Sequence, residues 1–194
     1  MTVILVALPA LTPAGANAAV AFTTAPNVPN FATVTLNGQA QTPNATMANW
    51  GVLQATTQSG WNVTVQGDTS AGKSAVFKVY CPNTTCGTDI GPAYVTGGRT
   101  LAADSLKLNS TGATFTGGIG STKPTHSCNA GCNVDSATAV KIASAGTAVS
   151  LTTWTSSSYS ATSLALTLPT TIRAPLQTGE IYHLDLIWTL NTGP

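Results

Sequence analysis

The strongest constraint on the fold is a short-range alternation of apolar and polar residues. In Trp61–Val65, for example, every second residue is apolar. A period of two residues is typical of a β-strand with one buried face, and no long stretch keeps the 3.6-residue period of a helix. Runs of this kind predict nine strands: Phe31–Leu36, Trp50–Thr57, Trp61–Gln66, Ala75–Cys81, Ser105–Asn109, Thr138–Ala143, Ala148–Thr155, Ser163–Leu168 and Tyr182–Leu190.

Clusters of glycine, asparagine, proline and serine separate these runs, as at Asn37-Gly38 and Gly97-Gly98. Many short strands divided by turn signals are typical of a sandwich or a barrel. We therefore expect an all-β fold, an antiparallel β-sandwich of immunoglobulin-like or jelly-roll-like type with long loops. The region from Gly112 to Asp135 has weak strand character and is predicted to be a long surface loop. Residues 19–194 are expected to form a single domain.

The N-terminus is typical of an export signal. Val3–Leu11 is an apolar run, and Ala16–Ala18 fits a small-x-small cleavage site, so residues 1–18 are predicted to be a signal peptide. The run is too short to span a bilayer, which takes about 20 residues. Only Met1 and Thr2 precede it, so the usual basic residues are missing and an upstream start stays open. An apolar N-terminal strand is the alternative.

Charge is scarce in this chain. Charged residues make up 7% of the sequence and the net charge is +1, whereas a typical soluble domain carries about 25% charged residues. This composition excludes a nucleic-acid binder that works by neutralising phosphates. Any partner is therefore expected to be recognised through uncharged groups and aromatic side chains.

The four cysteines form two local pairs along the sequence. Cys81 and Cys86 flank one short turn-rich segment, and Cys128 and Cys132 flank another. In an exported chain an even number of cysteines favours disulfides, and we expect each local pair to bond. The alternative is a zinc site with four thiolate ligands, with His126 nearby.

A Walker-like string, G-x-x-x-x-G-K-S, runs from Gly67 to Ser74. A phosphate-binding loop needs a following helix whose N-terminal amides hold the phosphates. The next segment, Ala75–Cys81, alternates like a strand and is followed by a proline. We therefore interpret the string as a loop between two strands.

Catalytic patterns are sparse. His183 and Asp185 are two residues apart on the last predicted strand, which places them on one face. Such a pair can bind a metal or act as a base, but no third ligand is evident, and a surface pair is the more frequent case. The carboxylates are scattered, although a distant pair such as a glycosidase uses stays open. No nucleophile-elbow motif is present. We therefore expect no enzyme activity and no metal or cofactor. The carboxylates are Asp68, Asp89, Asp104, Asp135, Glu180 and Asp185.

Two tryptophan-containing runs carry a resemblance to a known family. Gly60–Val65 begins with Gly-Trp, and Tyr182–Leu190 fits Y-x-x-x-L-x-W-x-L close to the chain end. Together they resemble the WxL family of bacterial surface proteins. Trp188 and Leu190 match the second motif, whereas Val63 stands where the first motif has leucine after Trp61. The resemblance implies noncovalent attachment to the Gram-positive cell wall, with peptidoglycan as the usual partner.

Strand faces suggest which tryptophans are buried. Trp61 and Trp188 each share a strand face with aliphatic residues. A tryptophan in such a position is more often part of the core than a ligand platform, so we expect both to be buried. Trp154 shares its face with serine and threonine, and Tyr159 follows in a serine-rich turn. Because an aromatic ring on a polar face can stack on a sugar, Trp154 and Tyr159 are our candidates for glycan contact. The alternative for Trp154 is an edge position under a loop.

The combined interpretation is a secreted, non-catalytic surface domain. Its expected partner is peptidoglycan or another wall glycan, with no nucleic acid and no membrane span. One alternative is a structural or adhesin-like subunit that assembles with other surface proteins, for example by strand addition at an exposed edge. A second alternative is an extracellular hydrolase, which would need two carboxylates facing each other across a cleft.

Overall fold

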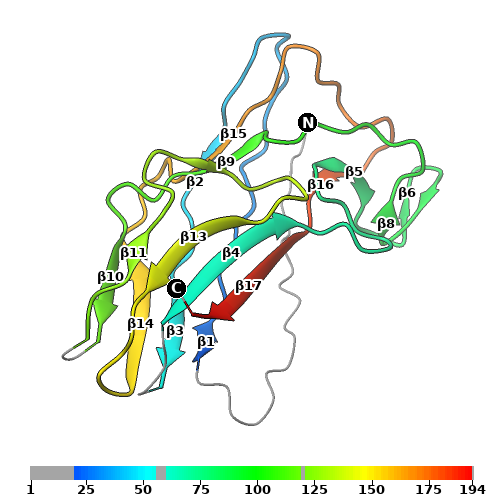
Figure 1. Cartoon of the computed structure of the whole chain (residues 1–194). Helices are drawn as coiled ribbons and strands as arrows, with labels where there is room; N and C mark the ends of the chain where they lie inside the picture. The colour runs from blue at the N-terminus through cyan, green and yellow to red at the C-terminus, as the bar shows by residue number, and fades with distance from the viewer. Residues whose placement is uncertain (1–19, 56–59, 119–120, 194) are drawn as a thin grey trace.

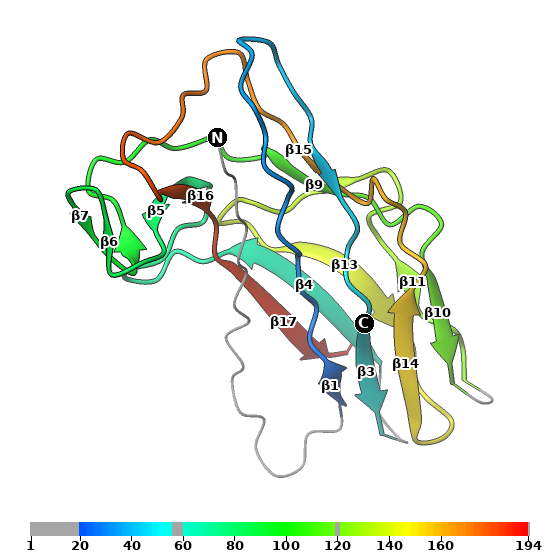
Figure 2. The same cartoon turned by 180° about the vertical axis from the view of Figure 1, so that it is seen from behind.

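The fold is all-β. The computed structural model describes residues 20–55, 60–118 and 121–193, and every regular element within these ranges is a strand. The strands form antiparallel sheets that pack together as a β-sandwich, which confirms the predicted fold class (Figures 1 and 2). The predicted signal peptide, residues 1–18, lies outside the described residues. None of the described segments forms a helix long and apolar enough to cross a membrane.

Two four-stranded sheets make up the body of the sandwich. The first sheet contains, in spatial order, β1 (Val20–Thr24), β3 (Trp50–Gln54), β14 (Thr152–Ser157) and β10 (Thr114–Gly117). The second contains β11 (Thr125–His126), β13 (Val140–Ala145), β4 (Trp61–Gly67) and β17 (Leu186–Thr192). In Figure 1 the second sheet lies in front of the first.

Aromatic side chains fill the space between these two sheets. Trp50 of β3, Trp61 of β4 and Phe115 of β10 meet edge to face, with ring centroids 5.4–6.4 Å apart. All three side chains are almost completely buried. Edge-to-face contacts at this separation add to the stabilisation from burial. The alternation in β4 follows from this packing, because Trp61, Val63 and Val65 all face inward.

Smaller sheets complete the molecule. A third sheet contains β12 (Cys132–Asn133), β9 (Leu106–Leu108), β15 (Leu164–Leu166) and β2 (Asn44–Ala45). A fourth contains β16 (Ile181–His183), β5 (Lys78–Cys81) and β8 (Ala93–Tyr94), and beside it lies the hairpin of β6 (Thr85–Cys86) and β7 (Asp89–Ile90). The fourth sheet and the hairpin occupy one end of the molecule (Figure 2).

Three sequence predictions need correction. Residues 31–36 form no strand, although Phe31 is buried, whereas β1 is a strand that the sequence did not indicate. The predicted loop 112–135 instead contains β10, β11 and β12, each of two to four residues. Each of these strands pairs with a longer partner strand. A strand of two residues is too short to show an apolar–polar alternation, so the sequence gives no sign of it.

The last predicted strand is also divided. Tyr182–Leu190 was expected to be continuous, but β16 pairs with β5 and β17 pairs with β4. At the break, the Asp185 N–H donates to the carbonyl of Ser74 (3.0 Å) and the Asp185 carbonyl accepts from the N–H of Asp68 (2.9 Å). The break therefore places His183 and Asp185 at the junction between two sheets, against the loop that follows β4.

Candidate functional site

The two motif strands lie side by side in the second sheet. β4 and β17 pair antiparallel, with Val65 opposite Trp188 and Val63 opposite Leu190. Trp61 and Val63 are fully buried, Trp188 is 6% exposed and Leu190 is partly buried. The core interpretation of both motif tryptophans is confirmed, so these residues build the sandwich and leave no indole face open to a ligand.

Trp154 does not form a sugar-stacking surface. It is 1% exposed and points into the core from β14, where its Nε1 donates to Gln54 Oε1 (3.3 Å). Gly118 covers the ring: it adopts φ +70°, and a Cβ there would lie 1.8 Å from the indole. The expectation failed because the polar neighbours of Trp154, including Ser156, are themselves buried.

Tyr159 is half-buried, and internal contacts occupy its hydroxyl. The oxygen accepts a hydrogen bond from Trp50 Nε1 (2.8 Å) and lies 2.7 Å from Ser156 Oγ. His126 extends this network through Ser156 (2.9 Å) and stacks on Phe115. Burial and the nearby Lys123 lower the pKa of His126 to about 4, so it is neutral at pH 7. The arrangement explains Tyr159 as a support of the core more readily than as a glycan contact.

The cysteines form the two disulfides expected from their spacing. Cys81 bonds Cys86 and Cys128 bonds Cys132, which leaves no free cysteine. All four thiolates are therefore unavailable to a metal, and the zinc alternative is wrong. The first disulfide joins β5 to β6 at the end of the molecule that carries the fourth sheet. Two disulfides are compatible with an extracellular protein.

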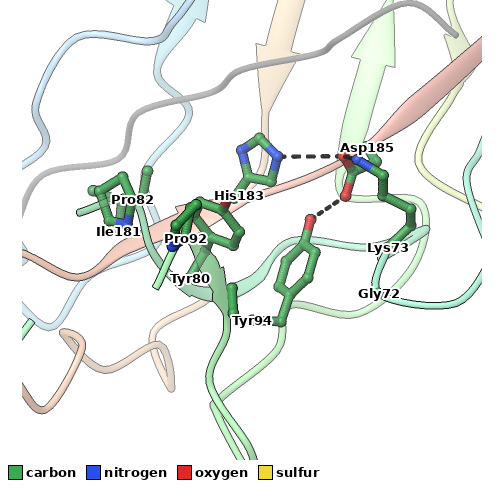
Figure 3. A pocket seen from close by; sticks show the side chains of 10 residues that line it. Gly72, Lys73, Tyr80, Pro82, Pro92, Tyr94, Ile181, His183 and Asp185 are labelled. Carbon is green, nitrogen blue, oxygen red and sulfur yellow. Dashed lines mark hydrogen bonds and ion pairs between the residues drawn. The ribbon is translucent and has the colours of Figure 1, made fainter. Parts of the chain in front are cut away.

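A cavity of about 570 Å³ opens in that region, between β5, β8, β16 and the loop after β4 (Figure 3). We call it the aromatic pocket. Three of the lining residues are buried: Ile181, His183 and Asp185. Its walls are two half-buried rings, Tyr80 and Tyr94. Exposed residues form the rim: Gly72, Lys73, Pro82, Pro92 and Ala93.

The rings of the pocket are packed against one another. Tyr80 and Tyr94 are opposite each other across the β5–β8 pair, with centroids 5.0 Å apart and planes at 66°. The His183 imidazole stacks on Tyr80 at 4.7 Å. This packing fixes the orientation of both tyrosine rings, while both residues are only half-buried and line the cavity. Fixed, partly open aromatic faces are a common feature of ligand sites.

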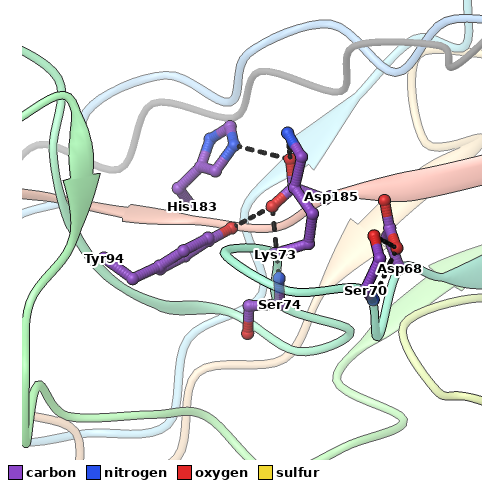
Figure 4. A network of polar contacts seen from close by, with 7 residues as sticks. All are labelled: Asp68, Ser70, Lys73, Ser74, Tyr94, His183 and Asp185. Carbon is purple, nitrogen blue, oxygen red and sulfur yellow. Dashed lines mark hydrogen bonds and ion pairs between the residues drawn. The ribbon is translucent and has the colours of Figure 1, made fainter.

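Asp185 is the centre of a polar network (Figure 4). Its Oδ2 accepts from the Tyr94 hydroxyl (2.5 Å) and from the N–H of Ser74 (3.2 Å). Its Oδ1 accepts from Lys73 Nζ (3.1 Å) and lies 3.5 Å from His183 Nε2. A carboxylate has about four lone-pair sites, so these four donors saturate it.

The network also sets the protonation of the pocket. Burial alone would raise the pKa of Asp185, but the hydrogen bonds from His183, Tyr94 and Lys73 outweigh burial and hold that pKa well below its usual range. Burial, together with the bond to the ionised Asp185, raises the pKa of Tyr94 far above its usual range. At pH 7 Asp185 is therefore ionised, and Tyr94 is a protonated donor.

The Walker-like string supplies two of these four donors. It forms a loop between β4 and β5, as expected, with no helix behind it. Gly72 adopts φ +79° in the turn that closes on Lys73, a conformation that favours glycine. At Gly67 a Cβ would lie 2.4 Å from the Ala75 carbonyl oxygen, so only glycine lets the loop return this closely. The string thus presents Lys73 and Ser74 to an internal carboxylate.

This arrangement makes Asp185 a poor general base. A saturated, strongly acidic carboxylate is a poor proton acceptor, and glycoside hydrolysis uses two carboxyl groups. Among the described residues that line the pocket, Asp185 is the only one with a carboxylate. His183 Nδ1 is buried and has no hydrogen-bonding partner. In the described part of the chain no group of three or more His, Cys, Asp and Glu residues could hold a metal ion.

The sequence pointed to part of this site. It placed His183 and Asp185 on one face by their spacing and singled out the loop that carries Lys73. It favoured a surface pair, however, whereas both residues are buried. It did not indicate Tyr80 and Tyr94, which lie 14 residues apart and meet only through strand pairing. An aromatic residue on each of two short strands was the available signal, but β8, at two residues, is too short to show a period.

Comparison with known proteins identifies no relative. No model of a protein family matches the chain, and no match is found among curated proteins or solved structures.

Proposed function

We propose that this protein is a secreted, non-catalytic surface domain that attaches noncovalently to the Gram-positive cell wall, with peptidoglycan as its partner. The observation that carries the proposal is the aromatic pocket, in which two fixed tyrosine rings lie beside a saturated polar network. Sugar rings bind proteins through stacking on aromatic faces combined with a few oriented hydrogen bonds. The pocket offers the aromatic faces of Tyr80 and Tyr94, and Lys73 at its rim has N–H donors beyond the one that it gives to Asp185.

Other features support the same proposal. The motif residues of β4 and β17 resemble the WxL family, and their burial gives the motif a structural role that holds the two strands together. The export signal predicted in residues 1–18 and the two disulfides are compatible with a location outside the cell. The low charge of the chain favours an uncharged or weakly charged partner.

Retention on purified peptidoglycan tests the proposal. We expect the protein to sediment with insoluble peptidoglycan, and we expect Tyr80→Ala to reduce the bound fraction at least about tenfold, as loss of one stacking contact predicts. Ile90→Ala is the control. It truncates a large side chain that is 79% exposed and lies outside the pocket lining, so it should leave retention unchanged.

Two outcomes would contradict the proposal. Absence of retention across a range of salt concentrations contradicts wall attachment itself. Retention that Tyr80→Ala leaves intact, in a variant with an unchanged melting temperature, places the contact somewhere other than the aromatic pocket.

A second candidate is a structural or adhesin-like subunit that assembles with other surface proteins. It is favoured by two large apolar side chains on the segment between β13 and β14, Val149 and Leu151, which are 71% and 64% exposed. Exposed apolar side chains that lie close together are a common feature of interaction surfaces. Analytical ultracentrifugation of the purified protein without glycan distinguishes the two candidates. A subunit that assembles should show a molecular mass that increases with protein concentration.

A further inference from the structure

The aromatic pocket is lined by two charged side chains, Lys73 and Asp185, and Lys73 has hydrogen-bond donors that Asp185 does not use. An ammonium group has three N–H donors, and Lys73 uses one of them on Asp185 Oδ1. Its side chain is 41% exposed at the rim of the pocket, whereas that of Asp185 is 4% exposed and saturated. A ligand in the pocket therefore meets free donors on Lys73 but no free carboxylate acceptor.

We infer that the aromatic pocket selects a pyranose ring that carries an N-acetyl group, with Lys73 donating a hydrogen bond to the acetyl carbonyl oxygen. The inference rests on the proposed function. It specifies the N-acetyl group as the part of the wall glycan that the same site recognises. The ring stacks its C–H face on the open surface of Tyr80 or Tyr94, and the acetyl methyl group packs on the apolar surface of Ile181 and Pro92.

Charge favours an acetyl carbonyl over a carboxylate as the acceptor. The ion pair between Lys73 and Asp185 is neutral overall, and its two charges are 3.1 Å apart. A ligand carboxylate bound to Lys73 would lie close to the ionised Asp185, and like charges at such separation repel each other. A neutral carbonyl oxygen accepts the same hydrogen bond without that repulsion.

The size of the cavity agrees with a small ligand unit. Its volume of about 570 Å³ lies within the usual range for ligand pockets, about 300–1,000 Å³. The rim carries Pro82 and Pro92 on one side and Gly72 and Lys73 on the other, as Figure 3 shows. A ring that enters between these two sides meets the tyrosine faces and the ammonium group at the same time.

Two oligosaccharides that differ only in the substituent at C2 of each ring test the inference. Chitotetraose carries an N-acetyl group on every ring, whereas cellotetraose has a hydroxyl there, and titration calorimetry gives the affinity for each. We expect chitotetraose to bind at least about tenfold more tightly, the effect of one hydrogen bond from a charged donor. Lys73→Met should bring the ratio of the two affinities close to one.

Lys141→Met is the matched control, because Lys141 is exposed on β13 outside the pocket lining. A structural effect of Lys73→Met would weaken the binding of both oligosaccharides equally. The ratio of the two affinities therefore separates loss of recognition from loss of folding. Equal affinities in the unaltered protein, or a preference that survives Lys73→Met, would overturn the inference. Tighter binding of an oligoglucuronate than of chitotetraose would overturn it in favour of an acidic sugar.

The proposed function can fail separately. If peptidoglycan is retained through Tyr80 but chitotetraose shows no preference, the inference fails and wall attachment stands. If peptidoglycan is not retained at all, the proposed function fails, and chitotetraose binding alone then decides the inference.

Discussion

Gln54 joins the indole groups of two tryptophans inside the core. Its Oε1 accepts from Trp61 Nε1 (3.0 Å) and from Trp154 Nε1 (3.3 Å), and its Nε2 donates to the carbonyl of Gly146. Trp188 differs, because its Nε1 is buried and has no hydrogen-bonding partner. The three tryptophans are therefore buried to similar extents, but the indole N–H groups of Trp61 and Trp154 have an acceptor and that of Trp188 has none.

This difference predicts unequal costs for the same substitution. Trp61→Phe removes a buried hydrogen bond to Gln54, whereas Trp188→Phe removes a donor that has no partner. Because Gln54 Oε1 keeps the hydrogen bond from Trp154, we expect Trp61→Phe to lower the free energy of unfolding by about 0.5–1.5 kcal/mol more than Trp188→Phe, beyond the similar loss of apolar area in both. Urea denaturation of the two variants measures the difference. Equal costs, or a larger cost at position 188, would show that the indole hydrogen bond is not what stabilises this site.

Asp135 predicts how stability depends on pH. It is fully buried, and its Oδ2 accepts from the N–H of Ser105 (2.9 Å) while its Oδ1 has no partner. Burial raises the pKa of Asp135 to about 6, against the effect of the backbone donors. A carboxyl with a raised pKa in the folded state stabilises the fold most below its unfolded pKa of about 4, and that stability is lost as the pH rises through about 6.

Comparison with Asp135→Asn isolates this contribution. We expect the unaltered protein to lose about 2–3 kcal/mol relative to the variant between pH 4 and pH 8, following the shift of the pKa. Urea denaturation of both proteins across this pH range gives the difference, and the remaining titrating groups cancel. Parallel pH profiles would mean that Asp135 keeps an ordinary pKa in the folded protein.

At the scale of strands, sequence alternation succeeds where one face is apolar and fails where both faces are polar. β4 alternates valine with asparagine and threonine, and its inner face was predicted correctly. β14 carries threonine and serine on both faces, so its composition could not distinguish the inner face. Ser156 is buried there because Tyr159 and His126 satisfy its hydroxyl, a contact between separate segments that no local pattern encodes.

The aromatic pocket shows the same limit. Its residues come from four segments that pairing and the break between β16 and β17 bring together. The sequence could place His183 near Asp185 because the two are neighbours in the chain. It could not place Tyr94 against Asp185, since the two are 91 residues apart.

The two disulfides provide a prediction at the same scale. Each closes a short loop, so removing either one by a double alanine substitution should lower the free energy of unfolding by about 2 kcal/mol. Pro82 lies inside the loop closed by Cys81 and Cys86 and also lines the pocket, whereas the Cys128–Cys132 loop contributes no residue to it. Loss of the first disulfide should therefore weaken oligosaccharide binding, and loss of the second should not. Equal effects on binding would show that the first loop does not position the rim.

At the scale of the whole molecule, scarce charge limits how a partner can be recognised. The chain has seven basic and six acidic side chains, and the ion pairs of the described residues lie within the pocket network. Binding that rests on aromatic stacking and a hydrogen bond should depend weakly on salt, because screening acts on exposed charges. Retention on peptidoglycan is therefore expected to change less than about threefold between low and physiological salt.

The most direct test of the central claim is an NMR titration with soluble peptidoglycan fragments, which reports every aromatic side chain in one experiment. The proposed site predicts that the ring resonances of Tyr80 and Tyr94 shift with a common affinity. The indole N–H resonances of Trp61, Trp154 and Trp188 should stay in place, because these rings are buried. Shifts that appear at the indole groups while both tyrosines stay unchanged would contradict the account.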